Sequence, residues 1–351
     1  MTRRALAALV VAGGLLHAGP ALAFKRTTTA GGIPLFWSNP QVTMVLNEGA
    51  ATPSCTSSAA PSVAAVQAVI PTWGAATSAG STTPCSKASL SYGGTTASGE
   101  TGYFQGEPGA PANSNLIVWR TKLCSQVVPA GDACTAACPV GLYCQNCPSK
   151  YHCWDDTRNS KTIALTTVTY ASSTGQIFDA DMELYGWDGT AGPLNSSTNV
   201  LGNLDGWYFT CVDSPAGPGA APATCSAADQ NPPAVCTCAT YGQSNCIFMD
   251  VQNTVTHELG HVLGLDHSNV ASATMSATAS PGETGKRTLD QDDMDGICSA
   301  YPAPKSSSGC ATAGSQPTLF ALLLGILALR LGVRRRTRRV TVSSTRSGGP
   351  L

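Results

Sequence analysis

The pattern of apolar and polar positions along this chain of 351 residues predicts both strands and helices. Runs of apolar and β-branched residues bounded by turn residues are typical of strands. Such runs occupy residues 42–47, 88–92, 115–119, 162–170, 176–184 and 247–251. Residues 61–76 carry apolar side chains at helical spacing instead, and Pro71 should kink or end that helix. The order of these segments predicts a strand–helix–strand–strand beginning.

One stretch of the chain reads HELGHVLGLDH and contains three of the five histidines. On a helix, His257 and His261 share one face, because residues four apart lie one turn above the other. Glu258 lies beside them on the same turn. Gly264 tolerates a left-handed backbone, so the chain can turn there and bring His267 back toward the first two imidazoles.

Three imidazoles in this arrangement are the ligand set of a catalytic zinc site. Each nitrogen binds Zn²⁺ at about 2.0–2.1 Å, and the fourth position is left to water. Glu258 is placed to take a proton from that water. The alternative is a helix with incidental histidines, which the length and specificity of the motif make much less favourable.

The run from Thr256 to Ser268 resembles the active-site helix of the matrixins, a family of metzincin metalloproteases. Metzincins also have a methionine turn beneath the metal, and Met275 is its candidate here. The position two residues after it is Ala277, where matrixins usually have proline. Residues 289–297 resemble the last matrixin helix, and there the resemblance implies that the acidic pair, Asp292 and Asp293, holds the methionine turn.

The resemblance implies an α+β metzincin catalytic domain. We therefore expect a twisted, mostly parallel sheet with an antiparallel edge strand at the cleft, a zinc-binding helix and a C-terminal helix. Residues 176–184 resemble the strand that borders the substrate cleft in bacterial matrixin-like proteins. An edge strand there would bind an extended protein or peptide substrate through its free backbone groups.

Three acidic residues, Asp179, Asp181 and Glu183, alternate along that strand and share one face. Carboxylates gathered on one face are conceivable ligands for Ca²⁺. A solvated strand face is the simpler interpretation. Asp266, in the middle of the histidine motif, is expected to be solvated or to form a local hydrogen bond.

The charge distribution argues against a nucleic-acid partner. The net charge is −1, but all 21 acidic residues lie between Glu48 and Asp295. The middle of the chain is therefore acidic and the ends are basic, whereas nucleic-acid binding requires a basic surface.

The 15 cysteines are typical of an exported, disulfide-bonded protein. Ten of them lie in two insertions, at about 124–158 and 195–245, and the first of these resembles no part of a matrixin. The rival interpretation is a second zinc site, for which Cys144 and Cys147 have suitable spacing. His152 lies in the first insertion, where we expect a surface or structural role.

The two ends of the chain resemble export and sorting signals. Residues 1–23 have a basic start, an apolar run and a cleavage site ending at Ala23, as in a signal peptide. A catalytic domain over 24–303 and a linker over 304–317 would follow. The hydrophobic segment with an arginine cluster at 318–339, preceded by Cys310 and followed by a polar tail at 340–351, resembles C-terminal sorting tails of the MYXO-CTERM kind.

That resemblance implies recognition by a sorting protease near Cys310 and attachment to the cell surface. The alternative is a permanent membrane anchor in the same segment. The sequence thus predicts a secreted or surface-attached zinc metalloendopeptidase. The rivals are a surface adhesion or binding module with a non-catalytic zinc, and a zinc enzyme acting on a non-peptide substrate. The chain lacks the cysteine-bearing propeptide motif by which matrixins are usually kept latent.

Overall fold

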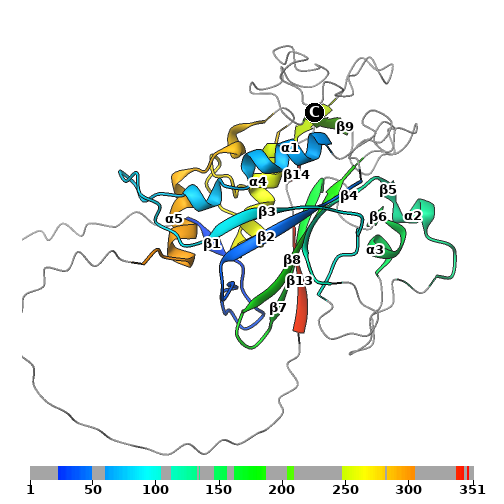
Figure 1. Ribbon diagram of the computed structural model, residues 1–351, viewed down its shortest axis with the longest axis horizontal. Helices are drawn as coiled ribbons and strands as arrows, with labels where there is room; N and C mark the ends of the chain where they lie inside the picture. Colours follow the sequence, from blue (N-terminus) through cyan, green and yellow to red (C-terminus); the bar gives the residue numbers. More distant parts are fainter. Residues whose placement is uncertain are drawn as a thin grey trace, which may run out of the picture.

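The computed structural model describes much of the chain between Ala23 and Pro304 and two short C-terminal strands (Figure 1). The described ranges are 23–49, 60–103, 112–132, 134, 146–155, 162–186, 204–208, 247–280, 283–304, 337–343 and 346–347. For 60–62, 204–208, 247–248 and the C-terminal strands only the backbone is described. The expected signal peptide before Ala23, most of the second insertion, Cys310 and the hydrophobic segment lie outside these ranges. Among the described helices none is long and apolar enough to cross a membrane.

A mixed sheet forms the centre of the described fold, with strand order β13-β7-β8-β4-β2-β3. Its strands are β2 (Gln41–Asn47), β3 (Ser89–Thr96), β4 (Asn115–Arg120), β7 (Ala164–Ala171), β8 (Ile177–Tyr185) and β13 (Thr337–Ser343). The pairs β3–β2, β2–β4 and β4–β8 are parallel. Strand β7 runs antiparallel to both β8 and β13. The strands predicted from sequence are thus present, and the sheet is mostly parallel.

One predicted strand has a different place in the sheet. Residues 176–184 were expected to form the edge strand at the cleft, but β8 lies between β4 and β7 and is paired on both sides. The antiparallel strand is β7 instead. Its outer side is paired with β13, so within the described sheet the antiparallel edge strand is β13 rather than residues 176–184.

The acidic face of β8 is also different from the expectation of a solvated surface. Asp179, Asp181 and Glu183 are all buried. Asp181 accepts hydrogen bonds from the backbone N–H groups of Gly102 and Leu116, at 2.5 and 2.9 Å. Glu183 forms a buried ion pair with Arg120, with 2.8 Å between Nε and Oε1. The face is covered by the chain around residues 99–103 and by the cysteine-rich lobe, so solvation there was wrongly predicted.

Helices α1 (Ala60–Val69) and α4 (Val251–Val262) connect the sheet to the histidine motif. Helix α1 ends before Pro71, as predicted, because proline lacks an N–H and clashes with the preceding turn. The chain continues as the short helix η1 (Trp73–Ala75), in which Trp73 is fully buried. Helix α4 packs against α1, β7 and β8. The apolar core between them holds α4 against the sheet.

The first cysteine-rich insertion folds as a small lobe beside the sheet (Figure 1). It contains β5 (Lys122–Leu123), α2 (Cys124–Val127), α3 (Cys147–Tyr151) and β6 (Cys153–Trp154). Disulfides join Cys124 to Cys153 and Cys134 to Cys147. Cys147 is therefore unavailable for the alternative zinc site, and His152 is exposed, as expected. A third disulfide, Cys85–Cys298, ties the segment before β3 to α5 (Gln291–Ala300).

The remaining strands are short. Strand β1 (Lys25–Arg26) pairs antiparallel with β11 (Leu265–Asp266), which lies directly after α4. Strand β9 (Leu204–Tyr208) pairs in parallel with β10 (Ile247–Asp250), which leads into α4. Strand β12 (Thr278–Ala279) pairs in parallel with β14 (Arg346–Ser347). A short helix, η4 (Gly285–Arg287), packs against α4 before α5 begins.

Candidate metal centre

Helix α4 begins at a buried carboxylate. The Asp250 side chain accepts a hydrogen bond from the Asn253 N–H at 2.6 Å and so satisfies one of the free donors of the first turn. Arg287 donates its Nε–H to the same carboxylate at 3.0 Å. Burial raises the pKa of Asp250, while the Arg287 guanidinium opposes that shift. The sequence analysis missed this anchor, although an aspartate directly before a helix is its usual signal.

The end of α4 is a tight turn at Gly264, which has φ of 83°. A side chain is excluded there twice: by the left-handed backbone, and because a Cβ would lie 2.9 Å from the Leu35 carbonyl oxygen. Trp37 Nε1 donates to the Val262 carbonyl at 2.7 Å, and the Tyr301 hydroxyl donates to the Leu263 carbonyl at 2.9 Å. The last carbonyls of the helix are thus satisfied, and β11 brings His267 back toward α4.

The three imidazoles of His257, His261 and His267 meet at one point, and their ligand nitrogens lie within 4.8 Å of one another. His257 and His261 are fully buried. His257 Nδ1 lies 2.6 Å from the Thr274 carbonyl oxygen, and His261 Nδ1 lies 2.8 Å from that of Leu265. A carbonyl only accepts, so each Nδ1 carries the proton and each Nε2 keeps its lone pair.

The donor set fits a small cation. Burial lowers the pKa of His257 well below its ordinary value and that of His261 to about 3, so both rings are neutral. Within the described part of the chain, His257 Nε2 is buried without a hydrogen-bond partner. The Nε2 atoms of His261 and His267 lie 3.2 Å apart. Two ligands of a tetrahedral zinc are separated by about 3.3 Å, so this spacing suits the ion.

Glu258 is buried beside the cluster and contacts the sheet. The Thr166 hydroxyl of β7 donates to Glu258 Oε2 at 2.7 Å and also lies 3.3 Å from the Glu258 carbonyl oxygen. This contact fixes the carboxylate against β7. Sequence reasoning missed Thr166, because it lies more than 90 residues before the motif in a strand of ordinary composition.

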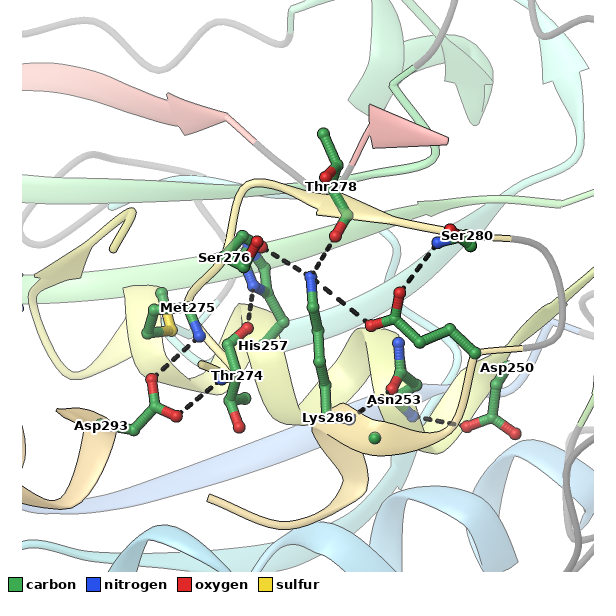
Figure 2. Close-up of polar contacts among 12 residues, drawn as sticks. Asp250, Asn253, His257, Thr274, Met275, Ser276, Thr278, Ser280, Lys286 and Asp293 are labelled. Atoms are coloured by element: carbon green, nitrogen blue, oxygen red, sulfur yellow. Dashed lines mark hydrogen bonds and ion pairs between the residues drawn. The ribbon is translucent and has the colours of Figure 1, made fainter. Parts of the chain in front are cut away.

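Met275 lies under α4 at the level of Gly260. A Cβ on Gly260 would approach Met275 Sδ to 2.3 Å and Trp73 Cζ2 to 2.7 Å, so only glycine allows this packing. The Asp293 carboxylate accepts from the Thr274 and Met275 N–H groups at 2.6 and 2.9 Å (Figure 2). Because the Thr274 carbonyl in turn holds His257, α5 controls the orientation of a candidate ligand.

Asp292, the other member of the acidic pair, accepts a hydrogen bond from the Ser268 hydroxyl at 2.6 Å. Ser268 follows His267 directly, so this contact holds the chain next to the third imidazole. Asp266 accepts from the backbone N–H of His267 at 2.7 Å, which is the local hydrogen bond anticipated for it. Both carboxylates therefore steady the backbone that carries His267.

Lys286 is a buried lysine that the sequence analysis did not single out. Its Nζ donates to the carbonyls of Ser276 and Thr278, both at 2.6 Å, and lies 3.9 Å from the Glu283 carboxylate (Figure 2). Burial lowers its pKa, and the neighbouring carboxylates oppose that shift. Lys286 thus holds the segment that follows Met275 and leads into β12.

Comparisons with known proteins agree with this geometry. Residues 218–302 match the matrixin family. The chain is similar to karilysin from Tannerella forsythia, at 42% identity over 71 residues, which is 20% of this chain and 14% of that protein. It is similar to metalloendoproteinase 4-MMP from Arabidopsis thaliana, at 39% identity over 59 residues and 17% of each chain.

A second Arabidopsis thaliana protein, metalloendoproteinase 1-MMP, is 41% identical over 63 residues, 18% of this chain and 17% of its own. The chain thus spans less than a fifth of the length of these relatives. No solved structure matches the chain. The matched segment contains the histidine cluster, Glu258, Met275 and α5, so a matrixin-like metal centre is supported by both sequence and geometry.

Proposed function

We propose that the protein is a zinc-dependent metalloendopeptidase that cleaves internal peptide bonds of proteins. The observation that carries the proposal is the convergence of three imidazoles, two of them buried and neutral with Nε2 lone pairs directed at one point. The match of residues 218–302 to the matrixins supports zinc as the metal and a protein or peptide as the substrate.

His257, His261 and His267 would hold the metal, and Met275 would pack beneath it. When bound, zinc lowers the pKa of water and polarises a carbonyl group. Glu258 accepts a proton from the attacking water and passes it to the leaving amine. Thr166 positions that carboxylate by donating a hydrogen bond to Oε2. Burial of the site strengthens these electrostatic contacts.

Export is part of the proposal. The disulfides are consistent with an oxidising compartment. We retain cleavage after Ala23 and sorting near Cys310 as hypotheses, with surface attachment as the outcome. Calcium is not needed to explain β8, because the described contacts of Asp181 and Glu183 already engage those carboxylates.

Substitution of Glu258 tests the enzymatic role. Glu258→Ala should keep one zinc per chain and lose casein cleavage by at least about 100-fold, because general-base catalysis contributes 10²–10⁴-fold. The measurements are metal content by mass spectrometry and hydrolysis with and without a chelator. Glu48→Ala is the matched control, since Glu48 is an exposed residue directly after β2 and its replacement should leave both values unchanged. Cleavage by the Glu258→Ala protein at the wild-type rate would contradict the assigned role.

The same measurements test the alternative function, a surface adhesion or binding module with a non-catalytic zinc. A binding module with a structural zinc would hold the metal, cleave no unfolded protein and be unaffected by Glu258→Ala. We favour the enzyme because Glu258 is buried beside the cluster and held by Thr166, a position that a purely structural site does not require.

A further inference from the structure

The outer side of β7 is occupied by the C-terminal part of the chain. Strand β13 pairs antiparallel with β7 along its full length, from Thr337 opposite Ala171 to Ser343 opposite Leu165. Strand β7 is the strand that contacts Glu258, through Thr166. The register partner of Thr166 is Val342. The tail therefore lies along the strand that borders the proposed catalytic base.

The next residues of the tail pair with the opposite side of the site. Strand β14 is parallel to β12, with Arg346 opposite Thr278. Strand β12 continues the segment whose Thr274 carbonyl holds His257 and which Lys286 fixes from below (Figure 2). The tail thus pairs with two segments that each make a hydrogen bond to a residue of the candidate site.

The two pairings lie close together along the tail. Ser343 and Arg346 are three residues apart, so the chain can cover at most about 10 Å between them. Within that distance it leaves the strand that holds Glu258 and reaches the segment next to His257. An extended polypeptide substrate would use the same backbone groups on β7, because β-strand addition requires an unpaired edge.

We propose that residues 337–347 occupy the side of β7 that an extended polypeptide substrate would use, and keep the enzyme latent until they leave it. The inference rests on the proposed function and concerns its regulation. It supplies a source of latency in a chain without the cysteine-bearing propeptide motif. Charge supports the pairing over long range, since the tail carries Arg338, Arg339 and Arg346 while every acidic residue lies between Glu48 and Asp295.

Tethering makes a weak occupant effective. A tethered segment has an effective concentration on the order of 1 mM. A tail with an intrinsic dissociation constant of about 0.1 mM would then occupy β7 in roughly ten of eleven molecules. Its removal should raise activity about tenfold. Insertion of residues 319–329 into a membrane, with the arginine cluster beyond it, would remove β13 from β7 and have the same effect.

The first test compares the full-length chain before and after release of the tail. A site for a sequence-specific protease replaces residues 311–316, and the cut protein is separated from its tail by gel filtration. We expect kcat/KM for casein to rise about tenfold, and a synthetic peptide of residues 337–347 to inhibit the cut enzyme competitively. Equal kcat/KM for the cut and uncut forms of an active enzyme would overturn the inference.

Strand geometry supplies a matched control for the peptide. Successive residues of a strand direct their N–H groups to opposite sides, so only alternate N–H groups can bond to β7. One peptide is N-methylated at residues 338, 340 and 342, the other at 339, 341 and 343. One of the two peptides should no longer inhibit the cut enzyme, and the other should inhibit it as the unmodified peptide does. Equal inhibition by both, or by a scrambled peptide, would show that pairing with β7 is not the cause.

A binding measurement separates this inference from the proposed function. Fluorescence anisotropy reports whether the labelled 337–347 peptide binds the cut Glu258→Ala protein, which requires no catalysis. Binding supports the inference even if no form of the protein cleaves casein, a result that would contradict the protease proposal alone. Cleavage at equal rates with no peptide binding would contradict the tail inference alone.

Discussion

Gly260 shows how closely the candidate site is packed at the level of single residues. It lies between Glu258 and His261 on α4, over the Met275 sulfur and the Trp73 ring. Trp73 Nε1 also donates to the Thr256 carbonyl at 2.8 Å, so the ring cannot easily move away. Helix α4 can therefore pack this closely against Met275 only with glycine at position 260.

Gly260→Ala should destabilise the protein by about 1–3 kcal/mol, because the added methyl overpacks a full core despite the better helix propensity of alanine. Urea denaturation of the two proteins measures the difference. Gly285→Ala is the control, since a Cβ there meets no atom within 4 Å and the backbone is helical. A Gly260→Ala protein with wild-type stability would contradict the close contact with Met275.

The buried histidines predict how the metal-free protein responds to pH. The pKa values of His257 and His261 are lowered in the fold, mainly by burial, so below pH 6.5 the unfolded chain binds protons that the folded chain does not. Stability therefore falls as pH drops from 6.5 toward 5, by up to about 1.4 kcal/mol per pH unit for each histidine.

Denaturation of the chelated protein at pH 7, 6 and 5 measures this slope. The double substitution His257→Asn and His261→Asn keeps a side-chain N–H for each carbonyl and removes the titrating rings. It should flatten the dependence in this interval, where most carboxylates stay ionised. An unchanged slope in the double variant would assign the pH response to other groups.

Among the elements, η4 and α5 together support α4, the helix that contains His257 and His261. Asp293 of α5 holds the Met275 turn, and Lys286 of η4 holds the two carbonyls that follow it. The backbone N–H of Lys286 donates to the Asn253 side chain of α4 at 2.7 Å. Helices η4 and α5 thus connect the first turn of α4 to residues 274–278, the segment that contains Met275.

Lys286→Met should lower the free energy of unfolding by about 1–3 kcal/mol, because two buried carbonyls lose a charged donor. Lys150→Met is the contrasting control. Lys150 forms an ion pair of 2.8 Å with Asp132, but it is exposed to solvent, which screens the pair. Its replacement should leave the denaturation midpoint unchanged. Equal effects of the two substitutions would mean that the contacts of Lys286 do not stabilise the fold.

The sequence predicted elements well where the information was local. The HELGHVLGLDH stretch contains both its ligands and its turn glycine, so its helix and the meeting of its histidines follow from spacing alone. The order of strands could not be obtained in this way. Which strand lies at the edge depends on pairing between distant segments. The sequence analysis assigned β8 to the edge, whereas β7 and then β13 lie outside it.

The buried face of β8 was missed for the same reason. Alternation shows that Asp179, Asp181 and Glu183 share a face, but it cannot show what covers that face. Here Arg120, the N–H groups of Gly102 and Leu116, and the adjoining lobe cover it. Thr166 and Lys286 were missed because neither belongs to a recognisable motif. Thr166 contacts Glu258, which lies 92 residues away, and Lys286 acts through buried main-chain carbonyls.

At the scale of the whole molecule, the disulfides differ in the length of chain that they enclose. Cys85–Cys298 joins residues separated by 213 positions and connects the sheet to α5. Cys134–Cys147 closes a separation of 13 within the cysteine-rich lobe. A crosslink stabilises mainly by restricting the unfolded chain, and the restriction grows with the length of the loop.

Removing the first bridge by Cys85→Ala and Cys298→Ala should cost about 5 kcal/mol, and removing the second by Cys134→Ala and Cys147→Ala about 3 kcal/mol. Thermal denaturation in oxidising buffer gives the order of the two. Zinc content should survive loss of the lobe bridge, because the histidine cluster lies on α4 and directly after β11. Loss of zinc on removing Cys134–Cys147 would contradict the separation of the lobe from the metal centre.

The pairing of β13 with β7 has a consequence for the protein in concentrated solution. A strand without a neighbour presents a row of backbone donors and acceptors that the same strand of another molecule can satisfy. While β13 is in place, it forms this edge of the sheet instead of β7, and its sequence includes Arg338 and Arg339, charged residues of the kind that oppose pairing between edge strands, whereas β7 has no charged residue. A molecule that has lost its tail would expose the full length of β7, so the released enzyme should self-associate and become less soluble as its concentration rises.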